Sequence, residues 1–169
     1  MKKTINLLGA ALLLCVFMFS SCSFGKKGTA YIYDGETQWE NWSYNFMTGS
    51  TPEGDLALWG ISFETTIGNS YRTISFMHMG SEPGTYTGTF DRASDKWSGD
   101  AVSHLYLTVD YDDQLYPKWL GQSAIVTIHN YDKKTRAMSA TIEAVVCKEG
   151  TNETRNIKIV MDNLHLVSK

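Results

Sequence analysis

Four histidines are the first residues whose side chains could bind a metal or move a proton. They are His78, His104, His129 and His165. No two of them stand two or four positions apart, the spacings that bring imidazoles together for zinc. Because each lies in a different predicted strand, we interpret them as isolated surface or hydrogen-bonded side chains. The sequence predicts no metal site and no cofactor.

One acidic cluster, Asp110-Tyr111-Asp112-Asp113, could offer oxygen ligands to calcium. It lacks the glycine and the distal glutamate of an EF-hand loop. We interpret it as a solvated loop at a strand end. If the protein did hold a metal, Asp110, Asp112 and the histidines would be the first ligands to test.

Patterns for nucleophilic catalysis are missing from the chain. It contains no Gly-x-Ser-x-Gly elbow and no glycine-rich phosphate loop. Ser103 and His104 are adjacent, so on a strand their side chains point to opposite faces. We therefore expect a protein that is not an enzyme. A hydrolase remains as an alternative, and it would require His, Asp and Ser side chains to converge in space.

Aromatic residues are the stronger candidates for binding. Trp39, Trp97 and Trp119 stand beside predicted turns, whereas Trp42 and Trp59 belong to apolar rows of predicted strands. Exposed aromatic rings stack on sugars and other flat ligands and anchor protein interfaces. We expect the first three as candidate ligand-binding residues, with rings that only cover the ends of the domain as the alternative.

The elements that position these side chains are strands, because the apolar pattern has a period of two. Glu40–Phe46, Ala57–Phe63, Arg72–Phe76 and Leu105–Val109 each alternate apolar and polar residues between turn residues. Eight to nine such strands predict an all-β fold, an antiparallel sandwich or barrel. Helix content should be low, with a short helical turn possible between Asp112 and Leu120.

The clearest predicted unit is a hairpin. Apolar rows at Ala124-Val126-Ile128 and Met138–Val146 flank a charged turn at residues 131–136. A second turn at residues 148–153 leads to the last strand, whose apolar face carries Ile157, Ile159 and Met161. The apolar parity changes at Asp162-Asn163, which predicts a bulge or bend there.

The N-terminal segment has the layout of a secretory signal. Lys2 and Lys3 precede an apolar run from Ile5 to Phe19, which ends at Ser20-Ser21-Cys22. The run Phe19-Ser20-Ser21-Cys22 resembles the lipobox of bacterial lipoproteins, with Phe19 where Leu is usual. The resemblance implies lipidation of Cys22, with an ordinary signal peptide cut near Ser21 as the alternative.

These features divide the chain into a signal peptide (1–21), a tether (22–29) and a single domain (30–169). Ser23, in place of the Asp that retains many lipoproteins at the inner membrane, favours the outer membrane. No acidic cluster follows Cys22. We therefore expect a lipid-anchored protein that faces the periplasm, with display on the cell surface as the alternative.

Composition excludes several classes of partner and site. Two of the 15 Lys and Arg residues and none of the 18 Asp and Glu residues lie in residues 1–21, so the chain from Cys22 has 13 basic and 18 acidic residues and a net charge of −5. A mildly acidic domain without a basic patch is a poor nucleic-acid binder. With Cys22 lipidated, Cys147 is the remaining thiol, which excludes an intramolecular disulfide.

Two motifs carry a further resemblance. Gly84-Thr85-Tyr86-Thr87-Gly88-Thr89-Phe90 and the hairpin that begins Val126-Thr127-Ile128-His129-Asn130-Tyr131-Asp132 resemble small all-β lipoproteins of Bacteroidota, most of them of unknown function. Ser139-Ala140-Thr141-Ile142 departs from the Ser-Gly-Thr-Phe that is common on the return strand of that group. The resemblance implies an all-β envelope lipoprotein.

Together these observations predict a membrane-anchored, non-catalytic binding or structural module. Its partners are the membrane, through Cys22, and a glycan or an envelope protein. Two alternatives remain: a carbohydrate-binding accessory protein that uses Trp39, Trp97 or Trp119, and a lipocalin-like carrier with an apolar cavity.

Overall fold

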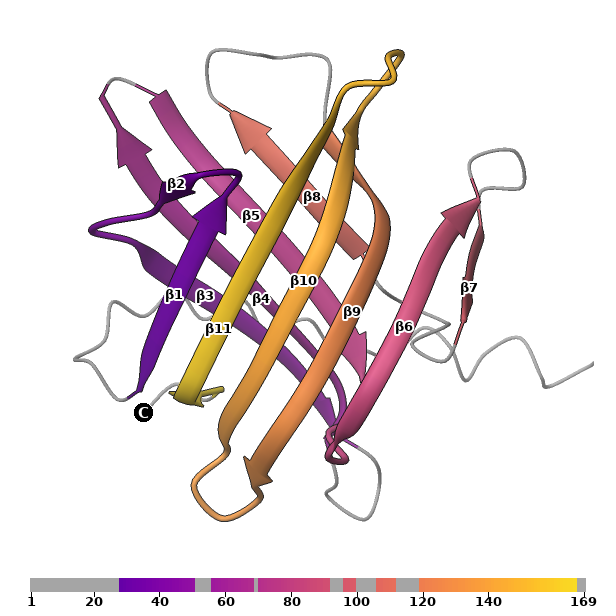
Figure 1. The fold of residues 1–169 in the computed structure, drawn as a ribbon. Helices are drawn as coiled ribbons and strands as arrows, with labels where there is room; N and C mark the ends of the chain where they lie inside the picture. Colours follow the sequence, from indigo (N-terminus) through magenta and orange to yellow (C-terminus); the bar gives the residue numbers. More distant parts are fainter. Residues whose placement is uncertain are drawn as a thin grey trace, which may run out of the picture.

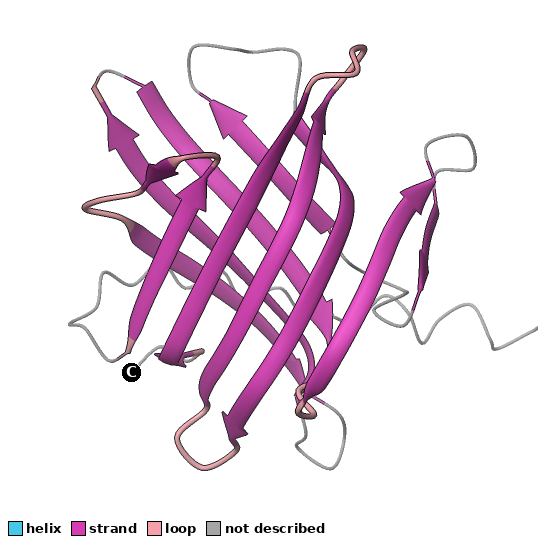
Figure 2. Cartoon of the chain, in the orientation of Figure 1, coloured by secondary structure: helices cyan, strands magenta, loops and turns pink. Residues whose placement is uncertain are grey.

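The computed structural model describes residues 28–50, 56–68, 70–91, 96–99, 106–111 and 119–166. The signal peptide and most of the tether, Cys22 included, lie outside these residues. The described residues form eleven strands and no helix (Figures 1 and 2). The strands are β1 (Thr29–Asp34), β2 (Thr37–Gln38), β3 (Ser43–Ser50), β4 (Leu56–Ile67), β5 (Ser70–Met79), β6 (Gly84–Asp91), β7 (Lys96–Gly99), β8 (Tyr106–Tyr111), β9 (Trp119–Asp132), β10 (Ala137–Lys148) and β11 (Thr154–His165).

All eleven strands belong to one antiparallel hydrogen-bonded network. Its order is β2-β1-β11-β10-β9-β8-β5-β4-β3, and β6 pairs with β9 and β7. Figure 1 shows the network folded into two facing layers, a front layer of β1, β11, β10, β9 and β6 and a back layer of β8, β5, β4 and β3. The predicted all-β antiparallel class is confirmed, with more strands than the expected eight to nine.

The two layers are joined where β8 meets the start of β9. Among the described residues, two pairs make this connection, Thr108 with Leu120 and Val109 with Trp119. Beyond it, β9 pairs with β6 from Ser123 onward. One edge of β9 thus pairs with β8 of the back layer at its start and with β6 of the front layer farther along. This shared edge allows the sheet to fold into two layers.

The alternating pattern of the sequence becomes two layers of side chains. Inward rows of the two layers pack into one core, while alternate residues face outward. The largest fully buried side chains are those of Trp39, Trp59, Phe63, Phe76, Ile32, Ile61, Ile74, Ile128, Met138, Ile142 and Ile157. Burial of these rows is the main source of stability for the fold.

The hairpin predicted around residues 131–136 is confirmed as β9–β10. At its turn, the Asp132 carboxylate accepts hydrogen bonds from the backbone N–H groups of Lys134 and Thr135 and from the Thr135 hydroxyl. Such bonds let an aspartate fix a turn locally. They also lower the pKa of Asp132, with the Thr135 hydroxyl as the largest cause.

The predicted bulge near Asp162-Asn163 is also confirmed. Between β10 and β11 the register passes from Met138–Leu164 to Ala140–Met161, so β11 carries one extra residue there. Asn163 adopts a φ of 49°, and its N–H donates to the Ser139 hydroxyl. This bulge moves Leu164 and Leu166 back into the core.

One local expectation was wrong, and a second falls largely on residues that the structure does not describe. The strand expected from Glu40 begins at Ser43 instead, after Asn41 adopts a φ of 51° that a strand does not allow. The helical turn expected between Asp112 and Leu120 falls largely outside the described residues, and Trp119 and Leu120 belong to β9. Within the part of the chain that the structure describes, no helix has the length and apolar character to cross a membrane.

Candidate functional site

Two of the three tryptophans expected to be exposed platforms are buried. Trp39 is 1% exposed and Trp119 is 3% exposed, and both belong to the core. The expectation of open stacking surfaces is therefore wrong for these two rings. Both stand beside turns in the sequence, but their rings pack into the core. Trp97 lies on β7, and its side chain is outside the described residues.

His78 also departs from its interpretation as a surface or hydrogen-bonded side chain. It is 1% exposed, and among the described residues neither of its ring nitrogens has a hydrogen-bond partner. Its ring centroid lies 5.8 Å from that of Trp59 and 5.1 Å from that of Tyr86. Burial in this aromatic setting lowers the pKa of His78 to about 4, so the imidazole is neutral at physiological pH.

The other candidate ligands do not assemble around His78. His129 Nε2 lies 2.9 Å from the Thr141 hydroxyl on the outer face. His165 is half-buried, and its backbone carbonyl accepts a hydrogen bond from the Tyr44 hydroxyl at 3.3 Å. His104, Asp112 and the side chain of Asp110 lie outside the described residues. Among those that are described, no group of three His, Cys, Asp or Glu side chains could hold a metal ion.

A buried charged cluster joins the two layers at one end of the core. Asp34 at the end of β1 has a fully buried side chain. Arg72 Nη1 of the back layer lies 3.5 Å from Asp34 Oδ2, and Arg155 Nη1 of β11 lies 3.3 Å from Asp34 Oδ1. The Arg155 guanidinium also stacks 4.6 Å above the Trp119 ring.

This cluster was not predicted from the sequence, although the strand pattern contained a signal for it. Asp34, Arg72 and Arg155 each continue an inward row of a strand, next to Ile32, Ile74 and Ile157 respectively. A charged residue on the inward parity requires a buried partner. The three residues are far apart in the sequence, so only the fold shows that they are each other's partners. The arrangement is a cross-layer ion cluster with a structural role.

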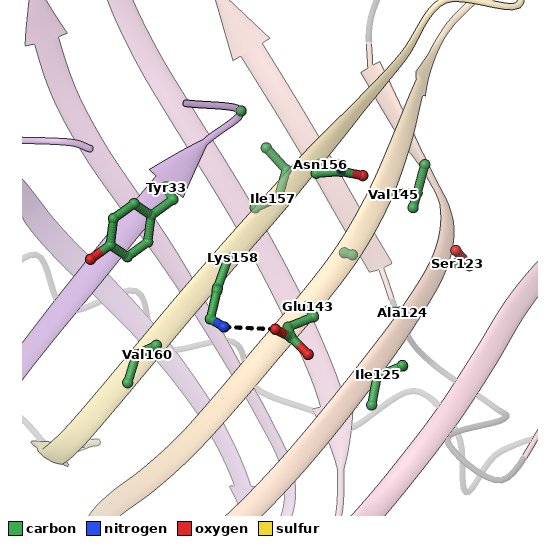
Figure 3. Close-up of a pocket in the computed structure, with 12 residues that line it drawn as sticks. Tyr33, Ser123, Ala124, Ile125, Glu143, Val145, Asn156, Ile157, Lys158 and Val160 are labelled. Atoms are coloured by element: carbon green, nitrogen blue, oxygen red, sulfur yellow. Dashed lines mark hydrogen bonds and ion pairs between the residues drawn. The ribbon is translucent and has the colours of Figure 1, made fainter. Parts of the chain in front are cut away.

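A hollow of mixed character lies on the outside of the front layer. We call it the outer groove, and it has a volume of about 710 Å³ (Figure 3). It extends over β1, β11, β10 and β9, and its characteristic residues are Tyr33, Ile125, Glu143, Val145, Lys158 and Val160. None of these residues was singled out from the sequence, because outward positions of a strand look like ordinary solvated surface.

An ion pair lies in the middle of the outer groove. Lys158 Nζ donates to Glu143 Oε1 at 2.7 Å, and Figure 3 shows the pair between the flanking aliphatic side chains. The two side chains are 49% and 51% exposed, so each keeps free access to solvent. Glu143 retains acceptor sites and Lys158 retains donors for a ligand, because one mutual bond uses only part of their capacity.

A second hollow, the back groove, lies on the outside of β3, β4 and β5. It has a volume of about 470 Å³, and Met47, Leu58 and Met77 surround Gly60 there. A Cβ at Gly60 would lie 3.2 Å from Met47 Cε, so the absence of a side chain keeps this notch open. Its polar side chains include Ser62 and Ser75, whose hydroxyls bond to each other at 2.9 Å. This surface is more apolar than the outer groove and offers fewer directed polar groups.

Cys147 is buried near the turn after β10. Its Sγ lies 3.4 Å from the Thr151 backbone oxygen. A buried cysteine of this kind packs as a small apolar side chain.

Comparison with known proteins found no matching family model, no matching curated protein and no matching solved structure. The resemblance to Bacteroidota lipoproteins therefore stays a prediction. Function has to be argued from the residues of the chain themselves.

Proposed function

We propose that this protein is a lipid-anchored, non-catalytic binding module of the bacterial envelope, and that it binds its ligand in the outer groove. The observation that carries the proposal is the Lys158–Glu143 pair within an apolar hollow of about 710 Å³. A concave apolar surface with a few convergent polar groups is the usual form of a binding site. Here those groups stand on paired strands, which hold them in place without ligand.

The packing of the interior supports a surface site rather than a carrier cavity. Large rings such as Trp59, Phe63 and Phe76 fill the space between the layers, and both hollows described above lie on outer faces. A lipocalin-like carrier needs an interior row that leaves space for its ligand. The inward rows of this chain are instead closed by large side chains.

The residues of the outer groove favour binding over catalysis. Its ionisable side chains are Tyr33, Glu143 and Lys158, and the last two neutralise each other. Ser123 also borders the groove, but no histidine is among the described residues that form it. A nucleophile requires a base within hydrogen-bond reach, and a glycosidase requires two carboxylates.

The anchor is tested by replacing its thiol. In Cys22→Ala, a fatty-acid analogue should no longer label the protein, because the thiol that receives the lipid is gone. The unchanged chain is the positive control. Persistent labelling of the variant would show that the lipid is attached elsewhere or that the anchor assignment is wrong.

Binding through the outer groove is tested by site-specific photo-cross-linking in intact cells. A benzophenone amino acid replaces Tyr33 in one variant and Tyr71, an exposed tyrosine of β5 in the other layer, in a matched control. We expect a discrete adduct from position 33 and none from position 71. No adduct from position 33, or equal adducts from both positions, would contradict the proposal.

A further inference from the structure

We infer that the outer groove binds a neutral linear polysaccharide that lies across the strands, with Tyr33 as its stacking platform. This inference rests on the proposed function and adds the chemical class of the ligand. The candidate binding residues are now a tyrosine and an ion pair on outward positions, and no longer the tryptophans expected from the sequence.

The first argument is the register of the front layer. Tyr33 lies opposite Lys158, Lys158 opposite Glu143, Glu143 opposite Ile125, and Ile125 opposite Thr87. One row thus crosses β1, β11, β10, β9 and β6. Successive strands are about 4.8 Å apart, a step comparable to one sugar ring of an extended polysaccharide. A chain laid along the row would place about one sugar over each strand.

The second argument is the chemistry of the row. A tyrosine ring offers a flat apolar face to the C–H groups of a sugar. Next to it, Lys158 offers N–H donors and Glu143 offers carboxylate acceptors, 2.7 Å apart and half-exposed. A sugar hydroxyl is both donor and acceptor, so two adjacent hydroxyls can bind this pair without breaking it. Ile125 then supplies an apolar contact that is 44% exposed.

A parallel row supplies further hydroxyl partners. Tyr31, which is 46% exposed, lies opposite Val160, and Val160 lies opposite Thr141. The row continues through Thr127 and Thr85, whose hydroxyls lie 3.2 Å apart. Like the first row, this row has a tyrosine on β1 at one end and a threonine on β6 at the other. A polymer wide enough to reach both rows gains contacts in each.

Charge favours a neutral polymer over an acidic one. Lys158 and Glu143 cancel each other, and the chain from Cys22 has 13 basic and 18 acidic residues. A polyanion would meet no uncompensated cation in this pair and a net negative protein. A protein segment is the competing occupant, and the experiments below distinguish it from a polysaccharide.

Affinity electrophoresis of the lipidated protein in detergent micelles tests the inference. The gels contain dextran, galactomannan, xyloglucan or mixed-linkage β-glucan as neutral polymers, and polygalacturonate as a polyanion. We expect at least one neutral polymer to retard the protein. Tyr33→Ala should weaken that affinity about tenfold or more, which corresponds to about 1.4 kcal/mol.

Matched variants separate stacking from a general change of the surface. Tyr33→Phe keeps the ring and should stay within about threefold of the unchanged protein, and Tyr71→Ala on the other layer should have no effect. Circular dichroism verifies that each variant is folded. Equal retardation of Tyr33→Ala and the unchanged protein would show that the polymer binds elsewhere and would overturn the site.

The remaining outcomes distinguish this inference from the proposed function. If no neutral polymer retards the protein, or if only polygalacturonate does, the polysaccharide class is wrong. A benzophenone adduct from position 33 whose added mass is identified as polypeptide by mass spectrometry would then mean that the outer groove binds a protein. The absence of both retardation and adduct would overturn the proposed function as well.

Discussion

The inward row of β5 has a polar side chain at each end, Arg72 and His78. The fold accommodates these two side chains in opposite ways. At the start of the row Arg72 approaches Asp34 to 3.5 Å and forms part of a charged cluster. At its end His78 is surrounded by rings, and neither of its nitrogens has a hydrogen-bond partner in the part of the chain that the structure describes. Between them lie Ile74 and Phe76, both buried. The first end keeps its charges by pairing them, and the second avoids charge by keeping the imidazole neutral.

The largest expected effect comes from removing the shared partner at the charged end. Asp34→Ala leaves two guanidiniums of like charge close together, and breaking a buried ion pair costs about 3–5 kcal/mol. We expect about 3 kcal/mol, since Arg72 and Arg155 are 23% and 34% exposed and can regain water. Urea unfolding at neutral pH measures this loss. A change below about 1 kcal/mol would mean that the cluster does not stabilise the layers.

At the neutral end, acid should destabilise the protein. The unfolded chain protonates His78 near the usual pKa of 6.5, whereas burial lowers the folded-state pKa to about 4. Protons are therefore bound preferentially by the unfolded state between these values. The loss should begin below pH 6.5 and be complete below pH 4, at about 3 kcal/mol.

The measurement compares urea unfolding of the unchanged protein and of His78→Phe at pH 7, 5.5 and 4. Their difference isolates His78 from the other titrating groups. If the difference does not vary with pH, His78 is not the buried neutral group that the structure describes.

At neutral pH, His78→Phe itself should raise the free energy of unfolding. This gain should be smaller than the losses expected for Asp34→Ala and for acid. Phenylalanine keeps a ring against Trp59 and Tyr86 and removes two nitrogens that have no partner. Loss of an unsatisfied buried polar group stabilises by about 1 kcal/mol. The expected result is a higher urea midpoint with an unchanged slope. A lower midpoint would indicate that the imidazole is better accommodated than its surroundings suggest.

The smallest effect should come from the ion pair on the outside. Glu143→Gln removes the charge from a pair whose side chains are about half-exposed. Exposed pairs contribute about 0–1 kcal/mol because water and salt screen them. The free energy of unfolding should therefore change by less than about 1 kcal/mol. A loss as large as that of Asp34→Ala would remove the contrast between inner and outer charges.

The sequence predicted the strands and hairpins well, because these depend on local alternation and turn residues. The turn at Asp132 and the bulge at Asn163 are local events, and both were found where expected. The burial of the tryptophans was harder to predict, because the sequence around a turn residue such as Trp39 does not indicate which layer will cover its ring. The outer groove could not be predicted, because Lys158 and Glu143 meet only through strand register.

The register also has a consequence for how the domain stands on a membrane. Thr29 at the start of β1 lies opposite Asp162, near the end where β9 turns into β10 (Figure 1). The proposed anchor, Cys22, precedes Thr29 by seven residues, a span of at most about 25 Å. Such a tether keeps the end of the domain that carries Lys133 and Lys134 near the lipid headgroups, and it allows the strands to stand upright on the bilayer. A polymer held across upright strands would run parallel to the membrane, so its length would not be limited by the height of the domain above the lipid.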